Sequence, residues 1–139
     1  MKREILKSKI HRAVVTDANL DYIGSLTLDE NLMDAANLCE FEKVDILNLT
    51  NGNRLQTYII KGERGLGDVC INGAAAHLVN RDDLVIIVSY CILDEEEIGP
   101  GLESVEDGLV LRLVELQHRA GPEADEAGLV GLVDVPESG

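Results

Sequence analysis

The sequence predicts a mainly β protein, a β-barrel with short helices. Three observations predict this fold class: several short runs rich in aliphatic and β-branched residues, an Asn51-Gly52 pair between two such runs, and helix signals in only two segments. A chain of 139 residues with 45% hydrophobic content is long enough to bury one core without disulfides or metals. We therefore expect a single folded domain.

The first half of the chain is expected to contain strands and one helix. Residues 5–15 and 21–28 favour strands, because aliphatic side chains partly alternate with polar ones there. Asp29 is a suitable N-cap for a short helix over residues 31–39, since its side chain can accept a free backbone N–H. One face of this helix would be apolar and would carry Leu32, Ala35, Ala36 and Cys39.

The clearest local signal is a hairpin over residues 43–62. Its two strand-like runs flank Asn51-Gly52, a dipeptide that readily takes positive φ at both positions of a type I′ turn. The GERGLGD segment after it lacks the residues of a phosphate-binding loop and is expected to be a turn. Four more elements are expected in chain order: a strand at 69–71, a helical turn at 73–79, a buried strand at 84–93 and a last strand at 109–116.

The negative charge is concentrated near the end of the chain. Residues 1–93 hold 13 acids and 10 bases, whereas residues 94–139 hold 13 acids and 2 bases, so the second segment supplies −11 of the net −14. Such a protein is repelled by phosphate backbones and anionic lipids, which argues against nucleic-acid and membrane-surface partners. We expect a folded domain over residues 1–116 and an acidic, flexible tail over residues 117–139.

A cluster of bases interrupts this negative charge at the start of the chain. It favours a small anionic ligand, although a solvated basic strand explains it equally well, and it comprises Lys2, Arg3, Lys7, Lys9 and Arg12. The three cysteines form no CxxC pair and cannot all pair with one another, which favours reduced thiols. Without a signal-peptide pattern or an apolar run long enough to span a bilayer, a cytoplasmic location is expected.

The usual catalytic constellations are largely missing from the sequence. His11, His77 and His118 show no zinc-ligand spacing, so no metal is expected. A serine hydrolase triad could be built around Ser25, but no GxSxG elbow surrounds it. The notable feature is Gly24-Ser25 within a strand-like run, where glycine marks a bulge or strain.

The chain resembles the aspartate 1-decarboxylase family over residues 1 to about 93, and the matching strings follow the family's order and spacing. They are LKSKIHRAVVT, LDYIGSLTLD, LMDAANL, TNGNRLQTYII, GERG and INGAAAHLV. The resemblance implies a double-psi β-barrel that assembles as a homotetramer, with active sites between neighbouring subunits. It also implies L-aspartate as substrate and β-alanine and CO2 as products, for pantothenate and coenzyme A synthesis by a carbon-carbon lyase.

The resemblance further implies that the precursor cuts itself between Gly24 and Ser25, with or without a maturation factor. Ser25 would attack the preceding carbonyl and end as a pyruvoyl group, so neither pyridoxal phosphate nor a metal would be needed. The ketone of this group would form a Schiff base with the substrate amine and take up electrons when CO2 leaves. The family pattern places Thr57, Asn72 and Tyr22 near the cleavage step.

Other residues match the family's catalytic and substrate-binding positions. Tyr58 matches the tyrosine that returns a proton to the substrate carbon. The substrate-binding positions match Lys9, His11, Arg54, Thr57, Gly73, Ala74 and Ala75. Lys9 and Arg54 would hold the substrate carboxylates, and an arginine can do so through two parallel hydrogen bonds.

The chain departs from the family pattern in three places. Leu66 replaces a small polar residue, Asp82-Asp83 replaces a Gly-Asp pair, and the segment after Ile98 does not align. An alternative interpretation is therefore a barrel that folds but never matures and acts as a binding or structural module.

Overall fold

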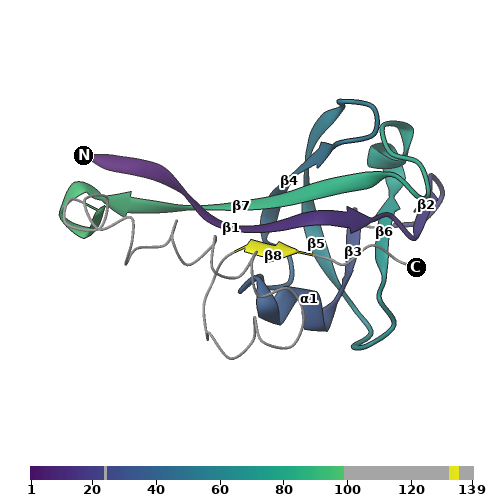
Figure 1. Ribbon diagram of the computed structural model, residues 1–139, viewed down its shortest axis with the longest axis horizontal. Coiled ribbons are helices and arrows are strands. Elements are labelled where there is room, and N and C mark those ends of the chain that lie inside the picture. The colour runs from purple at the N-terminus through teal and green to yellow at the C-terminus, as the bar shows by residue number, and fades with distance from the viewer. Residues whose placement is uncertain (24, 99–131, 135–139) are drawn as a thin grey trace.

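The structure is a computed structural model that describes residues 1–23, 25–98 and 132–134 of the 139. Its elements in chain order are β1 (Lys2–Val14), β2 (Asp17–Asn19), β3 (Leu26–Asp29), α1 (Glu30–Ala35), β4 (Lys43–Asn48), β5 (Arg54–Gly62), β6 (Val69–Asn72), the 3-10 helix η1 (Gly73–His77), β7 (Leu84–Asp94) and β8 (Leu132–Asp134) (Figure 1). No helix among these residues is long and apolar enough to cross a membrane.

All eight strands belong to one sheet, in the order β2-β6-β3-β5-β4-β7-β1-β8. The pairs β2–β6, β3–β5 and β1–β8 are parallel, and the other pairs are antiparallel. In Figure 1, β1 and β7 run side by side, and their paired ends extend beyond the other strands.

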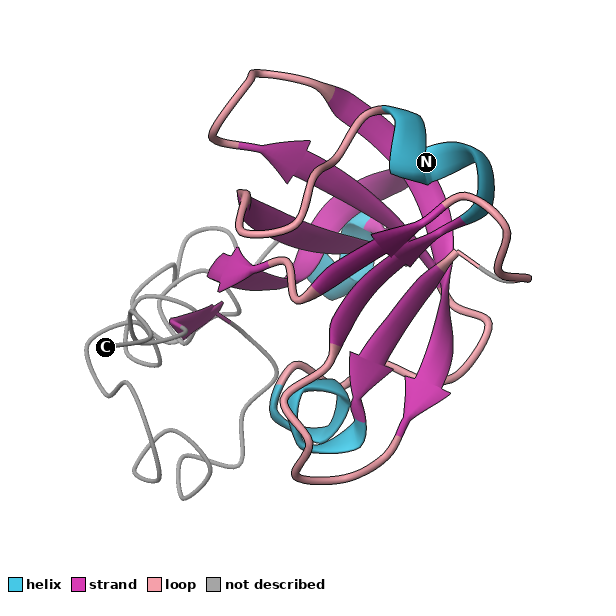
Figure 2. Cartoon of the chain, turned by 90° about the vertical axis from the view of Figure 1, so that its right-hand side faces the viewer, coloured by secondary structure: helices cyan, strands magenta, loops and turns pink. Residues whose placement is uncertain are grey.

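The sheet closes on itself because β1 and β2 are nearly continuous. Only Val15 and Thr16 separate the two strands, and these linking residues bond to β6 and to the segment before β7. The Val15 N–H donates to Asp83 O near β7, and the Thr16 N–H donates to Val69 O at the start of β6, each over 2.9 Å. The strands consequently curve around a common interior (Figure 2), and the predicted β-barrel with short helices is confirmed.

Aliphatic side chains fill the interior of this barrel. They come from every long strand and include Ile10, Leu26, Ile46, Ile59, Ile71 and Ile87, each at most 1% exposed. Close packing of this kind leaves little free space inside. At Gly62 the strands β3 and β5 approach so closely that an added Cβ would lie 2.9 Å from Leu28 O, which explains glycine there.

The strand predictions are confirmed over residues 5–15, 69–71 and 84–93, but the strand predicted over 21–28 begins only at Leu26. The preceding residues turn instead, because Asn19 accepts the N–H of Asp21 on its side chain over 2.9 Å. The short strand β2 was not predicted. It forms because the parallel pairing with β6, far away in sequence, compensates for its weak β propensity.

The predicted helix is confirmed at its start and is too long at its end. Asp29 accepts the Asn31 N–H over 2.8 Å as the predicted N-cap. The helix ends at Ala35 because Asn37 takes φ 52°, which a helix cannot continue. Cys39 therefore lies outside the helix and is exposed, contrary to the prediction that it belongs to the apolar face. The helical turn predicted over 73–79 is confirmed as η1.

The hairpin prediction is confirmed for the strands β4 and β5 but is wrong for the turn. Gly52 takes φ 81°, whereas Asn51 does not have positive φ, so the connection is not type I′. Asparagine side chains hold a longer loop instead: Asn48 accepts the Thr50 N–H and Asn51 accepts the Asn53 N–H, each over 2.9 Å.

Two loops explain how the chain tolerates its departures from the family pattern. Asp82 takes φ 73°, the left-handed region that favours glycine and that aspartate adopts more easily than most residues. The turn predicted in GERGLGD is confirmed, and the Asp29 carboxylate accepts the N–H groups of Gly65 and Gly67 over 3.1 and 2.6 Å. Leu66 between them is exposed. The predicted strand at 109–116 lies outside the described residues, as does nearly all of the predicted tail.

Candidate active site

Ser25 lies directly before β3 and is held to β6 through its backbone. The Asn72 N–H donates to the Ser25 carbonyl oxygen over 2.7 Å. Continuing the antiparallel register from the Leu26–Ile71 pair by one residue sets Ser25 opposite Asn72. The structure therefore brings together two of the predicted maturation residues. Gly24, the other residue of the predicted cleavage site, lies outside the described residues.

Polar residues of three strands form a patch beside Ser25 on the outer face of the barrel. Alternate residues of a strand point to opposite faces, and the intervening Leu26, Leu28 and Ile71 are buried in the core. The strand registers align the outward residues in two rows: Asp17, Cys70 and Thr27 in one, and Asn19, Asn72 and Ser25 in the other. Except for Ser25, these residues line a pocket of about 280 Å³, together with Tyr22 and Asp68.

Asn72 is the most buried polar residue of this patch, with 4% of its surface exposed. Its side-chain Nδ2 donates to Thr27 Oγ1 over 3.1 Å. Tyr22, also predicted near the cleavage step, lies on the rim of the pocket and is 60% exposed. Thr27 was not among the predicted site residues. Its spacing of two residues from Ser25 nevertheless indicates that, in a strand, both side chains lie on the same face.

Cys70 is a poor nucleophile in this setting. Burial raises the pKa of its thiol, and although a contact with Thr16 Oγ1 at 3.5 Å lowers it, the charges of Asp68 and Asp17 raise it further. The net effect keeps the thiol protonated at neutral pH, which makes it unreactive.

Thr57 and Tyr58 are consecutive in β5 and therefore point to opposite faces. Tyr58 lies on the outer face and is 40% exposed. Continuing the parallel β3–β5 register from the Leu26–Ile59 pair by one residue sets Ser25 opposite Tyr58. Thr57 is 8% exposed, and its Oγ1 has no hydrogen-bond partner among the described residues. The structure thus aligns Ser25 with Tyr58 and leaves one buried hydroxyl unsatisfied beneath them.

Arg54 and Lys9, the predicted carboxylate-binding residues, both lie on the outer face but far apart. Arg54 is on β5, four residues before Tyr58 and therefore on the same face. Lys9 on β1 pairs with Val88 on β7, and Val88 pairs with Asp45 on β4. Asp45 in turn pairs with Gln56 on β5. Three strand spacings of about 4.8 Å separate β1 from β5, or roughly 14 Å. The structure does not bring these two cations together within one chain.

Most of the basic cluster at the start of the chain is paired with acids. Lys2, Arg3 and Lys7 form ion pairs with Asp94, Glu95 and Glu42, respectively. Within the part of the chain that the structure describes, no ion pair involves Lys9 or Arg54. Two of the predicted ligand-binding cations therefore keep their charge available for an anionic partner.

The remaining predicted site residues lie close to the ends of β1 and β6. Gly73 to Ala75 begin η1 directly after Asn72, so their backbone adjoins the Ser25 row. Gly73 takes φ 64°, which a side chain would disfavour. His11 lies in an irregular part of β1 between Ile10 and Ala13.

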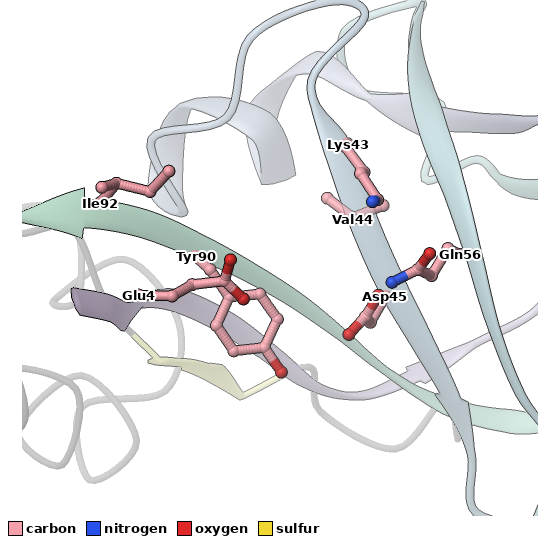
Figure 3. Close-up of a pocket in the computed structure, with 7 residues that line it drawn as sticks. All are labelled: Glu4, Lys43, Val44, Asp45, Gln56, Tyr90 and Ile92. Carbon is pink, nitrogen blue, oxygen red and sulfur yellow. The ribbon is translucent and has the colours of Figure 1, made fainter. Parts of the chain in front are cut away.

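A second pocket of about 170 Å³ opens on the outer face between β1, β4, β5 and β7, and it was not predicted. Its lining consists of Glu4, Lys43, Val44, Asp45, Gln56, Tyr90 and Ile92 (Figure 3). Burial raises the pKa of the Tyr90 hydroxyl, and the nearby Asp45 carboxylate raises it further, while Arg54 lowers it. Because Arg54 acts on Tyr90, it lies near this pocket. Lys43, which lines the pocket, is the register partner of Tyr58.

No group of three or more His, Cys, Asp or Glu residues in the described ranges could hold a metal ion. All three cysteines are free.

Comparisons with known proteins identify the family. The computationally designed msDPBB_sym2 protein matches 61% of this chain and 96% of its own, with 16% identity and a TM-score of 0.36. Aspartate 1-decarboxylase of Acetivibrio thermocellus is 62% identical over 93 residues, which cover 67% of this chain and 74% of that protein. Proteins of the same name from Bacillus cereus and Thermoanaerobacter pseudethanolicus are 60% and 59% identical, covering 70% of this chain and 77% and 83% of theirs. The sequence model described as aspartate decarboxylase matches residues 1–106, and the chain therefore belongs to the aspartate decarboxylase family.

Proposed function

We propose that this protein is a self-processing, pyruvoyl-dependent aspartate 1-decarboxylase, which converts L-aspartate to β-alanine and CO2 in the cytoplasm for pantothenate and coenzyme A synthesis. Membership of the family supports the reaction and its substrate. The position of Ser25 is the main observation that supports the proposal. Its carbonyl is bonded to the Asn72 N–H, it adjoins a polar pocket, and the strand register sets it opposite Tyr58.

Maturation begins with attack of Ser25 Oγ on the Gly24 carbonyl carbon. A C–O bond replaces the C–N bond of the peptide, and the hydroxyl proton passes to the released nitrogen, so an ester links the two residues. Loss of the Ser25 Hα and cleavage of the Cβ–Oγ bond then release Gly24 as a carboxylic acid. Water finally replaces the nitrogen of the dehydrated residue, which leaves as ammonia, and a pyruvoyl group remains at position 25.

The described residues fit these steps. Attack on a planar peptide needs donors for the developing oxyanion. Asn72 Nδ2 and the Thr57 hydroxyl, which has no partner among the described residues, are the candidate donors. A buried hydroxyl without a partner is costly unless it has a function. The pyruvoyl group takes the place of Ser25 itself, so it needs no additional space. We also assign Tyr22, on the rim of the polar pocket, to the cleavage step.

The pyruvoyl group supplies an electron sink for the electrons that the departing CO2 leaves on the substrate carbon. The chain's own residues bind the substrate and supply the proton. Tyr58 donates its phenolic proton to that carbon, and Arg54 and Lys9 hold the carboxylates through charge-assisted hydrogen bonds. Gly73 to Ala75 offer backbone groups beside the same row, and we also assign His11, at the β1 irregularity, to substrate binding.

The enzyme assembles as a homotetramer with active sites between subunits. Exposure of Tyr22 and Tyr58 supports this part of the proposal, because their rings lie on an outer face that a neighbouring subunit can cover. Neither pyridoxal phosphate nor a metal is needed.

Self-cleavage is tested by a denaturing gel and intact-mass measurement of the purified protein. We expect a 24-residue fragment ending in Gly24, and a larger fragment that resists Edman sequencing because a pyruvoyl terminus has no amine. Ser25→Ala should stay whole, whereas Ser8→Ala, which removes a buried hydroxyl in β1, should be cut. A wild-type chain that stays intact on prolonged incubation and releases no CO2 from L-aspartate would instead favour a binding or structural module.

A further inference from the structure

Thr27 is placed to control the orientation of the Asn72 side chain. It points outward from β3 between Leu26 and Leu28, which are both fully buried. Its Oγ1 accepts the hydrogen bond from Asn72 Nδ2 over 3.1 Å. Asn72 and Thr27 come from different strands, so this bond ties the carboxamide to the strand that continues from the cleavage site.

The Asn72 carboxamide needs such a constraint. A terminal amide rotates broadly about its last side-chain bond, and its two ends differ in hydrogen-bonding character. With one N–H committed to Thr27, the nitrogen end is fixed on the β3 side, and the second N–H remains available to the Ser25 row. The backbone of Asn72 is fixed independently, because its N–H donates to Ser25 O over 2.7 Å.

We propose that Thr27 is a positioning residue for self-cleavage: its hydroxyl orients the Asn72 carboxamide beside Ser25. This inference rests on the proposed self-processing function. The residue touches neither of the reacting atoms, so its effect passes through Asn72. An oriented donor stabilises a developing oxyanion more than a freely rotating one, because it does not have to reorganise during the reaction.

The test measures the rate of precursor cleavage after cell-free synthesis is stopped, by gel densitometry and mass measurement. Thr27→Val keeps the β-branched shape but removes the hydroxyl, and it should cleave about 10-fold more slowly than wild type. Thr27→Ser restores a hydroxyl and should cleave within about 2-fold of wild type. Thr50→Val is the matched control, because Thr50 Oγ1 accepts one N–H from Leu84 over 3.0 Å, away from the Ser25 patch.

A purely structural role is separated by a double variant. In the Asn72→Ala background, the orientation of the amide no longer matters, so adding Thr27→Val should cause no further slowing. The melting temperature of each variant shows whether it is folded, and Thr27→Ala replaces Thr27→Val if valine prevents folding.

Three results would overturn the inference. Thr27→Val could cleave as fast as wild type, Thr27→Ser could be as slow as Thr27→Val, or Thr27→Val could slow Asn72→Ala by the same factor as it slows wild type. Each of them leaves wild-type self-cleavage intact. An uncut wild-type chain instead removes the proposed function, and the role of Thr27 with it.

Discussion

Replacing Glu42 with glutamine should lower the free energy of unfolding by about 2 kcal/mol. The Glu42 carboxylate accepts hydrogen bonds from Lys7 Nζ over 2.6 Å and from Ser89 Oγ, and it thereby joins β1 and β7 to the segment before β4. The side chains of Lys7 and Glu42 are each 18% exposed. Breaking a fully buried pair costs about 3–5 kcal/mol and an exposed one about 0–1 kcal/mol, so a mostly buried pair falls between.

The effect of this substitution should depend on pH. Burial acts to raise the pKa of Glu42, but hydrogen bonds from Lys7, Ser89 and the Cys39 N–H outweigh it, so the pKa lies below its ordinary value of 4.5. A carboxyl whose pKa is lower in the folded state stabilises the fold above its unfolded pKa, and this stability is lost as pH falls through the folded pKa. The difference between wild type and variant should be complete near neutral pH and should shrink once the pH falls below about 4.5.

Urea unfolding at fixed protein concentration measures the difference, in a Ser25→Ala background so that every chain is intact. Glu40→Gln is the matched control, since exposed Glu40 accepts, among the described residues, only the Lys61 N–H, over 3.0 Å. Adding Lys7→Met to Glu42→Gln should recover part of the loss, because no charge is then left unpaired. Equal stability of wild type and Glu42→Gln at neutral pH, or an equal difference at pH values far below 4.5, would refute this reasoning.

Three further predictions concern turnover. Tyr58→Phe should be cut normally but decarboxylate poorly, because its proton is needed only after CO2 leaves; normal β-alanine production would remove Tyr58 from the mechanism. Arg54→Ala should lower the catalytic efficiency for aspartate by about 30-fold or more, since a poorly paired carboxylate costs roughly 2 kcal/mol or more; unchanged kinetics would make Arg54 an ordinary surface charge. Co-expressed Lys9→Ala and Ser25→Ala chains should together regain β-alanine production that neither variant shows alone, because each chain supplies the residue that the other lacks. Mixed oligomers without activity would contradict active sites between subunits.

Local sequence signals predicted the elements well where one residue sets the geometry. Asp29 caps its helix as expected, and the apolar run over residues 84–93 forms a strand. The hairpin turn could not be predicted in detail, because the side chains of Asn48 and Asn51 accept backbone N–H groups of the loop, and dipeptide preference does not include that competition.

The site was predictable as a set of residues but not as an arrangement. Asp17 is aligned with Cys70, and Thr27 with the same cysteine, through pairings of strands that are distant in the sequence. Nothing local sets the register of such strands, whereas a hairpin loop sets it for its own two strands. The hydrogen bond of Thr27 with Asn72 and the second pocket therefore could not be predicted from the sequence.

The filled interior of the barrel determines where the polar residues of the site can lie. Aliphatic side chains occupy the core, so most of the polar residues that we propose for the chemistry, among them Ser25 and Tyr58, lie on the outer face. Four strand spacings of about 4.8 Å, roughly 19 Å, separate the β3 strand after Ser25 from Lys9 on β1 across the sheet. The other way around the barrel, Lys9 lies eight residues before Asp17, or about 26 Å along the strand. These separations follow the curved sheet and are long for a lysine side chain, which supports our proposal that Lys9 of a second copy of the chain binds the substrate held at Ser25.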